Sequence, residues 1–384
     1  MKYYIIAGEA SGDLHGSNLI REIIRRDGAA RIRAWGGDLM KDAGAEIVKD
    51  YRDLAFMGFT EVIRNLPTIM RNIKFCKADI LHFNPDVVVF IDYPGFNLRI
   101  SEWARKTGFK TIYYISPQVW AWKESRVKGI RENIDKMLVI LPFEKDFFQK
   151  WNYETEYVGH PLVEVIERFK MSPEANKPPE IYIDGVPVQT GLPLIALLPG
   201  SRKQEILKKL PVMLEASRSF PEFRFVVAEA PGQDSAFYDE ILKHYPQAGR
   251  VKNQTYALLM HARAACVTSG TATLETALFG VPELICYKGS PVSYQIARRL
   301  IKVKYISLVN LIMDKPVVKE LIQDEMTVEN IVAELKKLIS DEEMRRRIYK
   351  DYTELHDLLS QGGKASEKAA ASIVDFVKKV KSKK

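Results

Sequence analysis

An acidic residue follows directly on one of the most apolar stretches of the chain. Asp92 comes after the expected strand 86–91 and before the turn residues Tyr93, Pro94 and Gly95. In a doubly wound α/β fold, the carboxyl ends of the central strands open onto the crevice where ligands bind. A carboxylate at this position could take the proton from a hydroxyl nucleophile, which is the role of a general base. The alternative is that Asp92 caps the next helix, but Asn97 is expected to be the better-placed cap.

The first expected strand, 2–7, ends in the turn Gly8-Glu9-Ala10-Ser11-Gly12-Asp13. Small residues let a ligand approach the backbone, and free N–H groups at a helix start favour anions. Ser11 is therefore a candidate contact for an acceptor or a phosphate, and a tight turn without a ligand is the alternative. The turn does not match G-x-G-x-x-G, and no ribose-binding acid of the dinucleotide type follows it, which argues against a nicotinamide or flavin cofactor.

Two further turns in the second half combine small residues with charged ones. Leu198-Pro199-Gly200-Ser201-Arg202 ends an expected strand, and the guanidinium of Arg202 suits bidentate recognition of phosphate. Ser269-Gly270-Thr271-Ala272-Thr273-Leu274-Glu275 opens an expected helix, whose N-terminal N–H groups and hydroxyls could bind a diphosphate. Glu275, one turn into that helix, could accept hydrogen bonds from both hydroxyls of a ribose. Capping by Ser269 or Thr271 is compatible with this role.

A third candidate loop carries aromatic residues. Trp120, Trp122 and Lys123 follow the expected strand 110–114 and could contact a sugar and a phosphate, although both tryptophans could equally belong to the core. His15 and His160 are alternative bases. We rank both below Asp92 because a lone histidine is more often structural.

The elements that would position these residues follow an α/β pattern, in which short apolar runs alternate with amphipathic stretches. The pattern predicts two doubly wound, Rossmann-like domains facing a cleft, followed by C-terminal helices. We expect an N-terminal domain at 1–170, a Pro- and Gly-rich junction at 171–193, a C-terminal domain at 194–345, and helices at 346–384 that pack back on the first domain. The expected strands are 2–7, 31–35, 86–91, 110–114, 136–140, 156–158, 194–198, 224–228, 264–268 and 283–287.

The composition is that of a globular protein with a basic surplus. Hydrophobic residues make up 46% of the 384 residues, and the formal net charge is +8. Such a surplus suits nucleic acid, an anionic membrane surface or a phosphorylated substrate, but no nucleic-acid recognition motif accompanies it. We expect the three cysteines to be reduced packing residues of a cytoplasmic protein. No uncharged stretch of the sequence is suited to form a membrane-spanning helix, so we expect at most a peripheral membrane contact.

Six motifs, taken together and in this order, closely resemble those of the lipid-A-disaccharide synthases, glycosyltransferases of outer-membrane assembly. They are Gly8–Asp13, Ile91–Pro94, Ser116–Trp122, Leu198–Arg202, Ser269–Glu275 and Ser307–Leu311. The resemblance covers nearly the whole chain up to the final helices. The segment 173–191 departs from the family pattern and reads as an insertion at the junction.

The resemblance implies a fold, a reaction and a set of residues. The fold is the two-domain glycosyltransferase B type, with no metal and no cofactor at the active site. The reaction joins UDP-2,3-diacylglucosamine to 2,3-diacylglucosamine 1-phosphate, giving a β-1,6-linked disaccharide and UDP. By position, Asp92 and Glu9 match the acidic catalytic residues of the family. The residues that match its nucleotide-binding region are Arg202, Ser269, Gly270, Thr271, Thr273, Glu275 and Asn310.

The acylated substrates require an apolar surface near the membrane, and the segment 56–77 is our candidate. A basic amphipathic segment suits the anionic cytoplasmic face of the inner membrane, and a core-packing helix is the alternative. Pro67 is expected near the start of a helix there. We include a homodimer among the expected states. The candidate membrane residues are Phe56, Met57, Phe59, Ile63, Arg64, Leu66, Ile69, Met70, Arg71, Lys74 and Lys77.

Two other functions fit parts of this pattern. A UDP-N-acetylglucosamine 2-epimerase or a peptidoglycan N-acetylglucosamine transferase would share the nucleotide site. A non-catalytic nucleotide sensor or membrane tether is a different class, and the position of Asp92 at a strand end argues against it.

Overall fold

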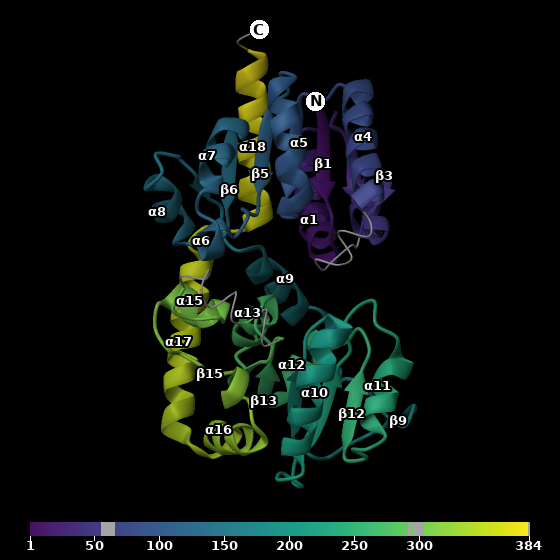
Figure 1. Cartoon of the computed structure of the whole chain (residues 1–384), viewed down its shortest axis with the longest axis vertical. Helices are drawn as coiled ribbons and strands as arrows, with labels where there is room; N and C mark the ends of the chain where they lie inside the picture. Colours follow the sequence, from purple (N-terminus) through teal and green to yellow (C-terminus); the bar gives the residue numbers. More distant parts are fainter. Residues whose placement is uncertain (55–65, 291–293, 295–302, 383–384) are drawn as a thin grey trace. The chain divides into compact units, whose positions relative to one another are not determined.

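The computed structural model describes residues 1–54, 66–290, 294 and 303–382 and divides into two compact units (Figure 1). The first unit comprises Met1–Pro161 together with Leu359–Lys384, and the second comprises Leu162–Leu358. The sequence predicts a junction at 171–193, whereas the first unit ends at Pro161 and the second begins at Leu162.

The first unit is built on a seven-stranded parallel sheet with the order β3-β2-β1-β4-β5-β6-β7. Its strands are β1 (Lys2–Ala7), β2 (Arg31–Gly36), β3 (Glu46–Asp50), β4 (Val87–Ile91), β5 (Thr111–Tyr114), β6 (Lys136–Val139) and β7 (Glu156–Tyr157). Its helices are α1 (Ala10–Arg26), α2 (Asp38–Asp42), the 3₁₀ turn η1 (Tyr51–Leu54), α4 (Leu66–Phe83), α5 (Pro94–Lys106), α6 (Val119–Trp122), α7 (Arg126–Asn133) and α8 (Glu144–Gln149); α9 (Pro161–Lys170) leads into the second unit.

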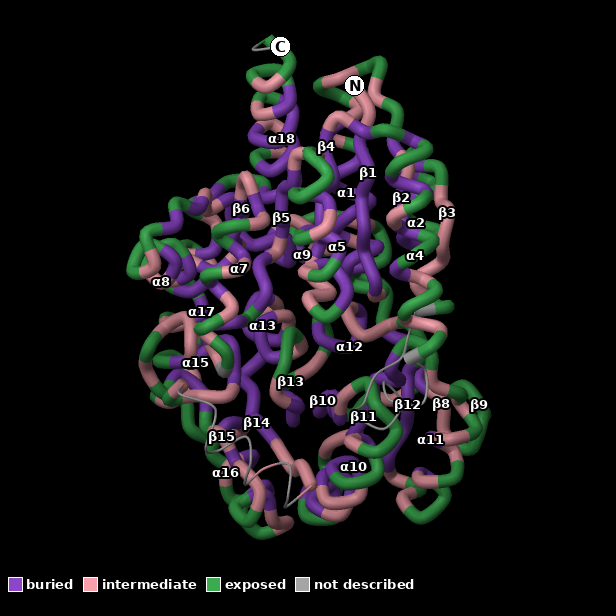
Figure 2. Tube along the Cα trace, turned by 45° about the horizontal axis from the view of Figure 1, so that its top comes forward, coloured by how far each residue is buried: buried purple, intermediate pink, exposed green. Residues whose placement is uncertain are grey.

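Both faces of this sheet are covered, which explains why its central strands are apolar on both sides. Every residue of β4 and β5 is buried, and Figure 2 shows β1, β4 and β5 as buried strands. One face packs on α1 and on α18 (Ala365–Lys381), through residues such as Leu19 and Ile373. The other face packs on α4, α5 and α7, through residues such as Ile80 and Ile100. The C-terminal helix α18, yellow in Figure 1, is thus part of the first unit although it comes from the far end of the sequence.

The second unit carries an eight-stranded sheet with the order β15-β14-β13-β10-β11-β12-β8-β9. Its strands are β8 (Ile181–Ile183), β9 (Val186–Val188), β10 (Leu194–Leu198), β11 (Arg224–Ala228), β12 (Ala248–Val251), β13 (Ala262–Val267), β14 (Glu283–Tyr287) and β15 (Lys319–Ile322). Its helical elements include η2 (Pro173–Asn176), α10 (Lys203–Ser217), α11 (Ser235–Leu242), α12 (Thr255–His261), α13 (Thr271–Leu278), α15 (Leu308–Met313), η3 (Gln323–Glu325), α16 (Val328–Ser340) and α17 (Glu342–Ser360), which ends in the first unit.

The segment 171–193, expected as an interdomain junction, lies in the second unit and contributes two strands to its sheet. Strands β8 and β9 form an antiparallel hairpin, and β8 pairs antiparallel with β12 at Tyr182 and Arg250. Asp184 and Gly185 form the tip with φ values of 49° and 74°, which is the backbone that a tight hairpin turn needs. This segment therefore extends the sheet beyond β12.

The described cysteines and helices agree with two further predictions from the sequence. Cys76, Cys266 and Cys286 are free and buried. In the described part of the chain, we find no helix that combines the length and the apolar character needed to cross a membrane.

Candidate functional site

The first candidate site lies where the winding direction of the first sheet reverses. The chain proceeds from β1 to β2 on one side and from β4 to β5 on the other, so the carboxyl ends of β1 and β4 are neighbours, with Ala7 paired to Ile91. Directly beyond this pair, the ring of Tyr93 lies against the backbone of Gly8: a Cβ atom added to Gly8 would be 2.3 Å from Tyr93 Cδ1. Only glycine fits at position 8, and the two turns that carry Glu9 and Asp92 are in contact.

Asp92 has an uncommon backbone conformation. Both Asp92 and Tyr93 have positive φ values, 45° and 50°, which non-glycine residues seldom adopt. The Asp92 carbonyl accepts hydrogen bonds from Tyr113 Oη at 2.5 Å and from Asn97 Nδ2 at 2.7 Å, and its N–H donates to the Tyr114 carbonyl at 3.3 Å. Such a conformation persists where its surroundings over-determine it, and it is concentrated at functional sites.

These contacts correct one sequence expectation. Asn97 lies inside α5, and the residue at the N-cap position is Tyr93. The amide of Asn97 instead holds the carbonyl of Asp92, so its role is to fix the turn. Three hydrogen bonds fix the backbone of Asp92, and they therefore restrict the orientation of its side chain at the end of β4.

The electrostatic environment of Asp92 suits a proton acceptor. Burial raises the pKa of its carboxyl to about 6, and a hydrogen bond from the Tyr93 backbone partly opposes this shift. A general base works best when its pKa lies near the operating pH, because it is then both deprotonated and sufficiently basic. Asp92 therefore combines a strand-end position, a fixed backbone and a raised pKa.

Glu9 occupies the N-cap position of α1 and is half-buried, without a side-chain capping bond. Glu9 directly follows Gly8, whose backbone lies against the Tyr93 ring, so it belongs to the same edge of the sheet as Asp92. Burial and the charge of Glu9 raise the pKa of the Tyr93 hydroxyl. Ser11 is exposed in the first turn of α1. Asp13, by contrast, is buried and accepts the backbone N–H groups of Gly37 at 2.7 Å and Met40 at 3.1 Å, which fixes the start of α2.

The two histidines are poor proton acceptors in this structure. Burial lowers the pKa of His15 to about 4, and burial together with the neighbouring His15 lowers the pKa of His160 to about 3. An imidazole of such low basicity would take a proton weakly at neutral pH. Asp92 therefore remains the preferred candidate for the general base, ahead of both histidines.

The loop between β5 and α7 is held by a buried carboxylate. Glu144 accepts hydrogen bonds from Ser116 Oγ, from Trp120 Nε1 at 3.0 Å, and from the Leu141 N–H at 2.9 Å. Trp120 is buried, and its placement favours the packing alternative. Lys123 is exposed just after α6, and the side chain of Trp122 lies outside the described part of the structure.

The second candidate site lies where the winding of the second sheet reverses, between β10 and β13. The loops that follow these two strands are joined by a hydrogen bond from the Thr268 N–H to the Leu198 carbonyl at 2.9 Å. Gly200 and Gly270 have φ values of 111° and 139°, a backbone that side chains disfavour, so both turns need glycine. Arg202 is exposed at the N-cap position of α10 and pairs with Glu205 at 3.1 Å.

The hydroxyls of the second loop have different surroundings. Ser269 Oγ donates to the Ile306 carbonyl at 2.8 Å, and Thr273 Oγ1 donates to the Gly270 carbonyl at 2.9 Å. These two hydroxyls fix the turn. Thr271, by contrast, is exposed at the first position of α13, where its hydroxyl can reach a bound ligand.

Asn310 belongs to the packing around α15. Its amide donates to the Val318 carbonyl at 2.9 Å and to Glu320 Oε1 at 3.0 Å, and its Oδ1 accepts the Val318 N–H at 2.9 Å. The side chain is buried and committed to these internal bonds. This geometry favours a positioning role for Asn310 over a direct ligand contact.

Glu275 is held by an aromatic cluster. Its Oε1 accepts a hydrogen bond from Tyr256 Oη at 2.8 Å, and burial raises the pKa of its carboxyl, an effect that the Tyr256 bond partly opposes. The Tyr256 ring lies 5.4 Å from the Phe169 ring and 5.0 Å from the Phe279 ring, between centroids. The carboxylate is therefore placed by α12 as well as by its own helix, α13.

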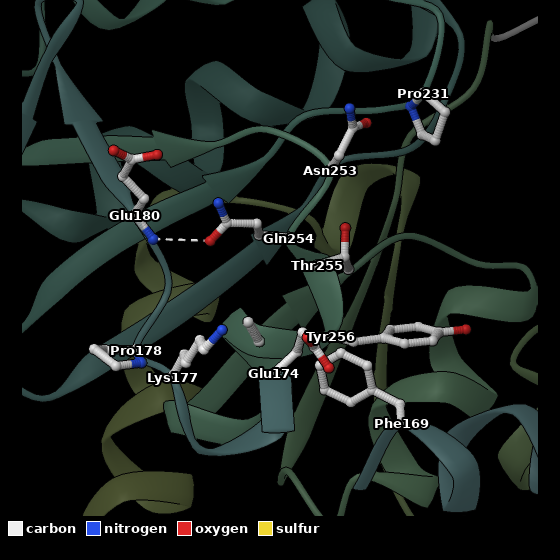
Figure 3. A pocket seen from close by; sticks show the side chains of 11 residues that line it. Phe169, Glu174, Lys177, Pro178, Glu180, Pro231, Asn253, Gln254, Thr255 and Tyr256 are labelled. Carbon is white, nitrogen blue, oxygen red and sulfur yellow. Dashed lines mark hydrogen bonds between the residues drawn. The ribbon is translucent and has the colours of Figure 1, made fainter. Parts of the chain in front are cut away.

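A pocket of about 710 Å³ opens beside this cluster within the second unit (Figure 3). Figure 3 shows the rings of Phe169 and Tyr256 at one end and Asn253 and Pro231 at the other, while Gln254 Oε1 accepts the Glu180 N–H at 2.8 Å. The pocket is lined by Phe169, Glu174, Lys177, Pro178, Glu180, Pro231, Asn253, Gln254, Thr255, Tyr256 and Ala257. The pocket was not predicted from the sequence. Asn253 lies two residues after the strand β12, and this short strand contains Arg250 and was itself not predicted.

Comparison with known proteins gives the family. The model of the family described as lipid-A-disaccharide synthetase matches residues 3–374. The chain belongs to the lipid-A-disaccharide synthase family. The synthase of Syntrophus aciditrophicus is 39% identical over 98% of this chain and 97% of its own length. The synthase of Geobacter sulfurreducens is 35% identical over 98% and 97%.

Solved structures confirm the predicted two-domain glycosyltransferase B fold. The UDP-GlcNAc 2-epimerase of Neisseria meningitidis has a TM-score of 0.64 at 12% identity and covers 99% of this chain and 100% of its own. The glycosyltransferase of kitacinnamycin has a TM-score of 0.65 at 14% identity, covering 97% and 98%. At such low identity the epimerase shares only the fold, and the family match separates this synthase-family chain from it.

The proposed membrane segment is described in part. Phe56, Met57, Phe59, Ile63 and Arg64 lie outside the described residues, as does the side chain of Leu66. Helix α4 begins at Leu66, so Pro67 stands in its first turn as predicted. Its outer face exposes Met70, Phe75 and Leu81, with exposed fractions of 55%, 45% and 53%, next to the exposed Arg71 and Lys74.

Two other residues of the proposed segment face the protein. Ile69 is half-buried against the core, and Lys77 lies with its Nζ 5.5 Å from the centroid of the Trp103 ring. Within the described part of the segment, the exposed face of α4 is therefore narrower than the predicted contact surface. Over residues 1–54, 66–290, 294 and 303–382, no group of three or more histidine, cysteine, aspartate or glutamate side chains could hold a metal ion.

Proposed function

We propose that this chain joins the diacylglucosamine unit of UDP-2,3-diacylglucosamine to 2,3-diacylglucosamine 1-phosphate. The products are the β-1,6-linked lipid A disaccharide 1-phosphate and UDP. The observation that carries the proposal is the family match over residues 3–374, supported by relatives of the same name at 34–39% identity. Asp92, at the reversal point of the first sheet, supplies the group that the reaction requires.

Asp92 is the general base of this reaction. Its carboxylate takes the proton from the acceptor's 6-hydroxyl while that oxygen forms a bond to C1 of the donor sugar. The bond between C1 and the diphosphate oxygen breaks, UDP leaves, and the configuration at C1 is inverted. A positioned base contributes about 10²–10⁴-fold to such a step. Glu9, beside Tyr93 on the same edge, completes the acidic site.

The second unit holds the nucleotide. Arg202 and the N–H groups at the start of α13 bind the diphosphate, because a guanidinium and a helix N-terminus both favour anions. Glu275 accepts hydrogen bonds from the ribose hydroxyls, in the orientation fixed by Tyr256. The uracil base extends toward the pocket beside Tyr256, where Asn253 and Gln254 offer amide groups. Arg202 and the start of α13 thus stabilise the departing diphosphate.

The acyl chains require contact with a lipid surface, which we assign to the outer face of α4. Three apolar side chains, Met70, Phe75 and Leu81, are exposed there beside Arg71 and Lys74. Such a face suits peripheral association with the cytoplasmic side of the inner membrane. A homodimer is part of this proposal and is tested by sedimentation of the purified chain.

The direct test measures UDP release with the donor alone and with donor and acceptor together. A transferase of this kind releases UDP only when both lipids are present. Release from the donor alone at an equal rate would indicate another reaction, and an epimerised sugar nucleotide would indicate an epimerase.

A further inference from the structure

A lysine side chain is buried beneath the loops of the second site. Lys209 lies on α10 with an exposed fraction of 1%. Its ammonium donates to Thr268 Oγ1 and lies 3.6 Å from Glu205 Oε2. Lysine is almost never fully buried unless it is paired, because removing the charge from water is costly. An apolar side chain of similar length would fill this space without that cost.

The ammonium reaches both loops at the reversal point. A Cβ atom added to Gly200, in the loop after β10, would lie 3.4 Å from Lys209 Nζ. Thr268, which accepts its hydrogen bond, directly precedes Ser269 and Gly270 in the loop after β13. One cationic group therefore lies under the first loop and is bonded to the second.

Glu205 connects this buried cation to an exposed one. Its Oε1 pairs with Arg202 at 3.1 Å, and its Oε2 faces Lys209. The Glu205 carboxylate is thus shared by two cations, and Arg202, Glu205 and Lys209 together carry a net charge of +1. Burial lowers the pKa of the Lys209 ammonium, while the charge of Glu205 and its hydrogen bond oppose that change.

We propose that Lys209 is a positioning residue for the donor diphosphate. Its ammonium ties the loops after β10 and β13 together, orients Arg202 through Glu205, and adds positive potential beneath the bound anion. Lys209 acts through these neighbours and does not contact the substrate. This inference rests on the proposed function, which places a nucleotide diphosphate at these loops.

The test compares UDP and uridine binding to the full chain by competition. Lys209→Met keeps the length of the side chain and removes its charge. Losing one charged interaction should lower the ratio of UDP to uridine affinity by roughly tenfold, because only UDP carries the diphosphate. Met213→Ala is the matched control, since Met213 is buried on the same helix. It should lower stability and leave the ratio unchanged.

Thr268→Val gives a second variant that preserves shape and cuts the bond to the loop after β13. The ratio should fall by about threefold, less than for loss of the charge. An unchanged ratio in Lys209→Met, or in Thr268→Val if Lys209→Met does not fold, overturns the inference. An equal fall in Met213→Ala also overturns it, because the effect would then be structural. Wild-type chain that binds no UDP would instead overturn the proposed function.

Discussion

At the residue scale, the proposed reaction depends on Asp92. Its place after a buried strand was visible in the sequence because a run of five apolar residues ends at the carboxylate. Its raised pKa and its left-handed backbone were not visible. The raised pKa arises from burial in the folded chain. The left-handed backbone is held by Tyr113 and Asn97, which lie 21 and 5 residues away in sequence. Only the fold brings their donors to one carbonyl oxygen.

Replacing Asp92 by asparagine should lower turnover by about 10²–10⁴-fold, because the amide cannot accept the proton. Asparagine also tolerates the left-handed backbone, so the fold should be retained. Single-turnover kinetics with saturating donor and acceptor measure the loss, and UDP titration should give nearly the wild-type affinity. Turnover of Asp92→Asn near the wild-type rate would remove Asp92 from the mechanism.

The raised pKa of Asp92 predicts the direction of the pH dependence. A base acts only when deprotonated, so kcat/KM should rise with pH and level off above an apparent pKa of about 6. The same shift affects stability in the opposite sense. The folded state holds this proton more tightly than the unfolded chain, so Asp92 should reduce the free energy of unfolding as pH rises from about 4 to about 6.

A pH–rate profile and denaturant unfolding at several pH values check both effects. In Asp92→Asn, the acidic limb of the residual activity and the corresponding loss of stability should both disappear. A wild-type profile that is flat between pH 5 and pH 7 would be inconsistent with this residue as the base.

At the element scale, most of the sheet strands could be predicted because apolar runs and intervening amphipathic stretches are local patterns. The hairpin β8–β9 was missed because the Pro- and Gly-rich composition of 171–193 was read as a linker. Its Asp184-Gly185 tip is a known hairpin signal, and it lies between short alternating segments. The assignment of β8 to the edge beside β12 depends on long-range pairing, which composition does not reveal.

The pairing of α12 with α13 leads to a prediction about ribose recognition. Tyr256→Phe removes the hydroxyl that orients Glu275 and retains the ring in the aromatic cluster. In Tyr256→Phe, the preference for UDP over 2′-deoxy-UDP should fall. In Glu275→Ala it should fall further, because UDP loses hydrogen bonds to a charged group that are worth about 1.5–3 kcal/mol. Competition binding of the two nucleotides measures the ratio.

Tyr238→Phe is a matched control, because this buried tyrosine accepts a backbone bond from Ala230 elsewhere in the same unit. It should leave the discrimination intact. Wild-type selectivity for the ribose in the Glu275→Ala variant would show that another group reads these hydroxyls.

At the scale of the whole molecule, the basic surplus and the exposed face of α4 predict reversible binding to anionic vesicles. Each basic residue near such a surface contributes about 1 kcal/mol, and salt screens exposed charges over about 8–10 Å. Replacing Arg71 and Lys74 by glutamine, or Met70 and Phe75 by serine, should reduce vesicle co-sedimentation and leave UDP affinity unchanged. High salt should release the wild-type chain.

The matched control replaces Lys378 and Lys379, two exposed lysines of α18, by glutamine. This change removes the same charge from the lysine-rich end of the chain. Binding that is lost in this control and kept in the α4 variants would place the membrane contact on α18.

The structure of the reaction product tests the central claim most directly. Full chain is incubated with UDP-2,3-diacylglucosamine and 2,3-diacylglucosamine 1-phosphate, and the lipid product is analysed by mass spectrometry and by NMR of its anomeric proton. We predict a tetra-acylated disaccharide 1-phosphate with a β-1,6 linkage, formed together with one equivalent of UDP. Unchanged lipids, an α-linked disaccharide, or a free sugar released by hydrolysis would contradict the proposed function.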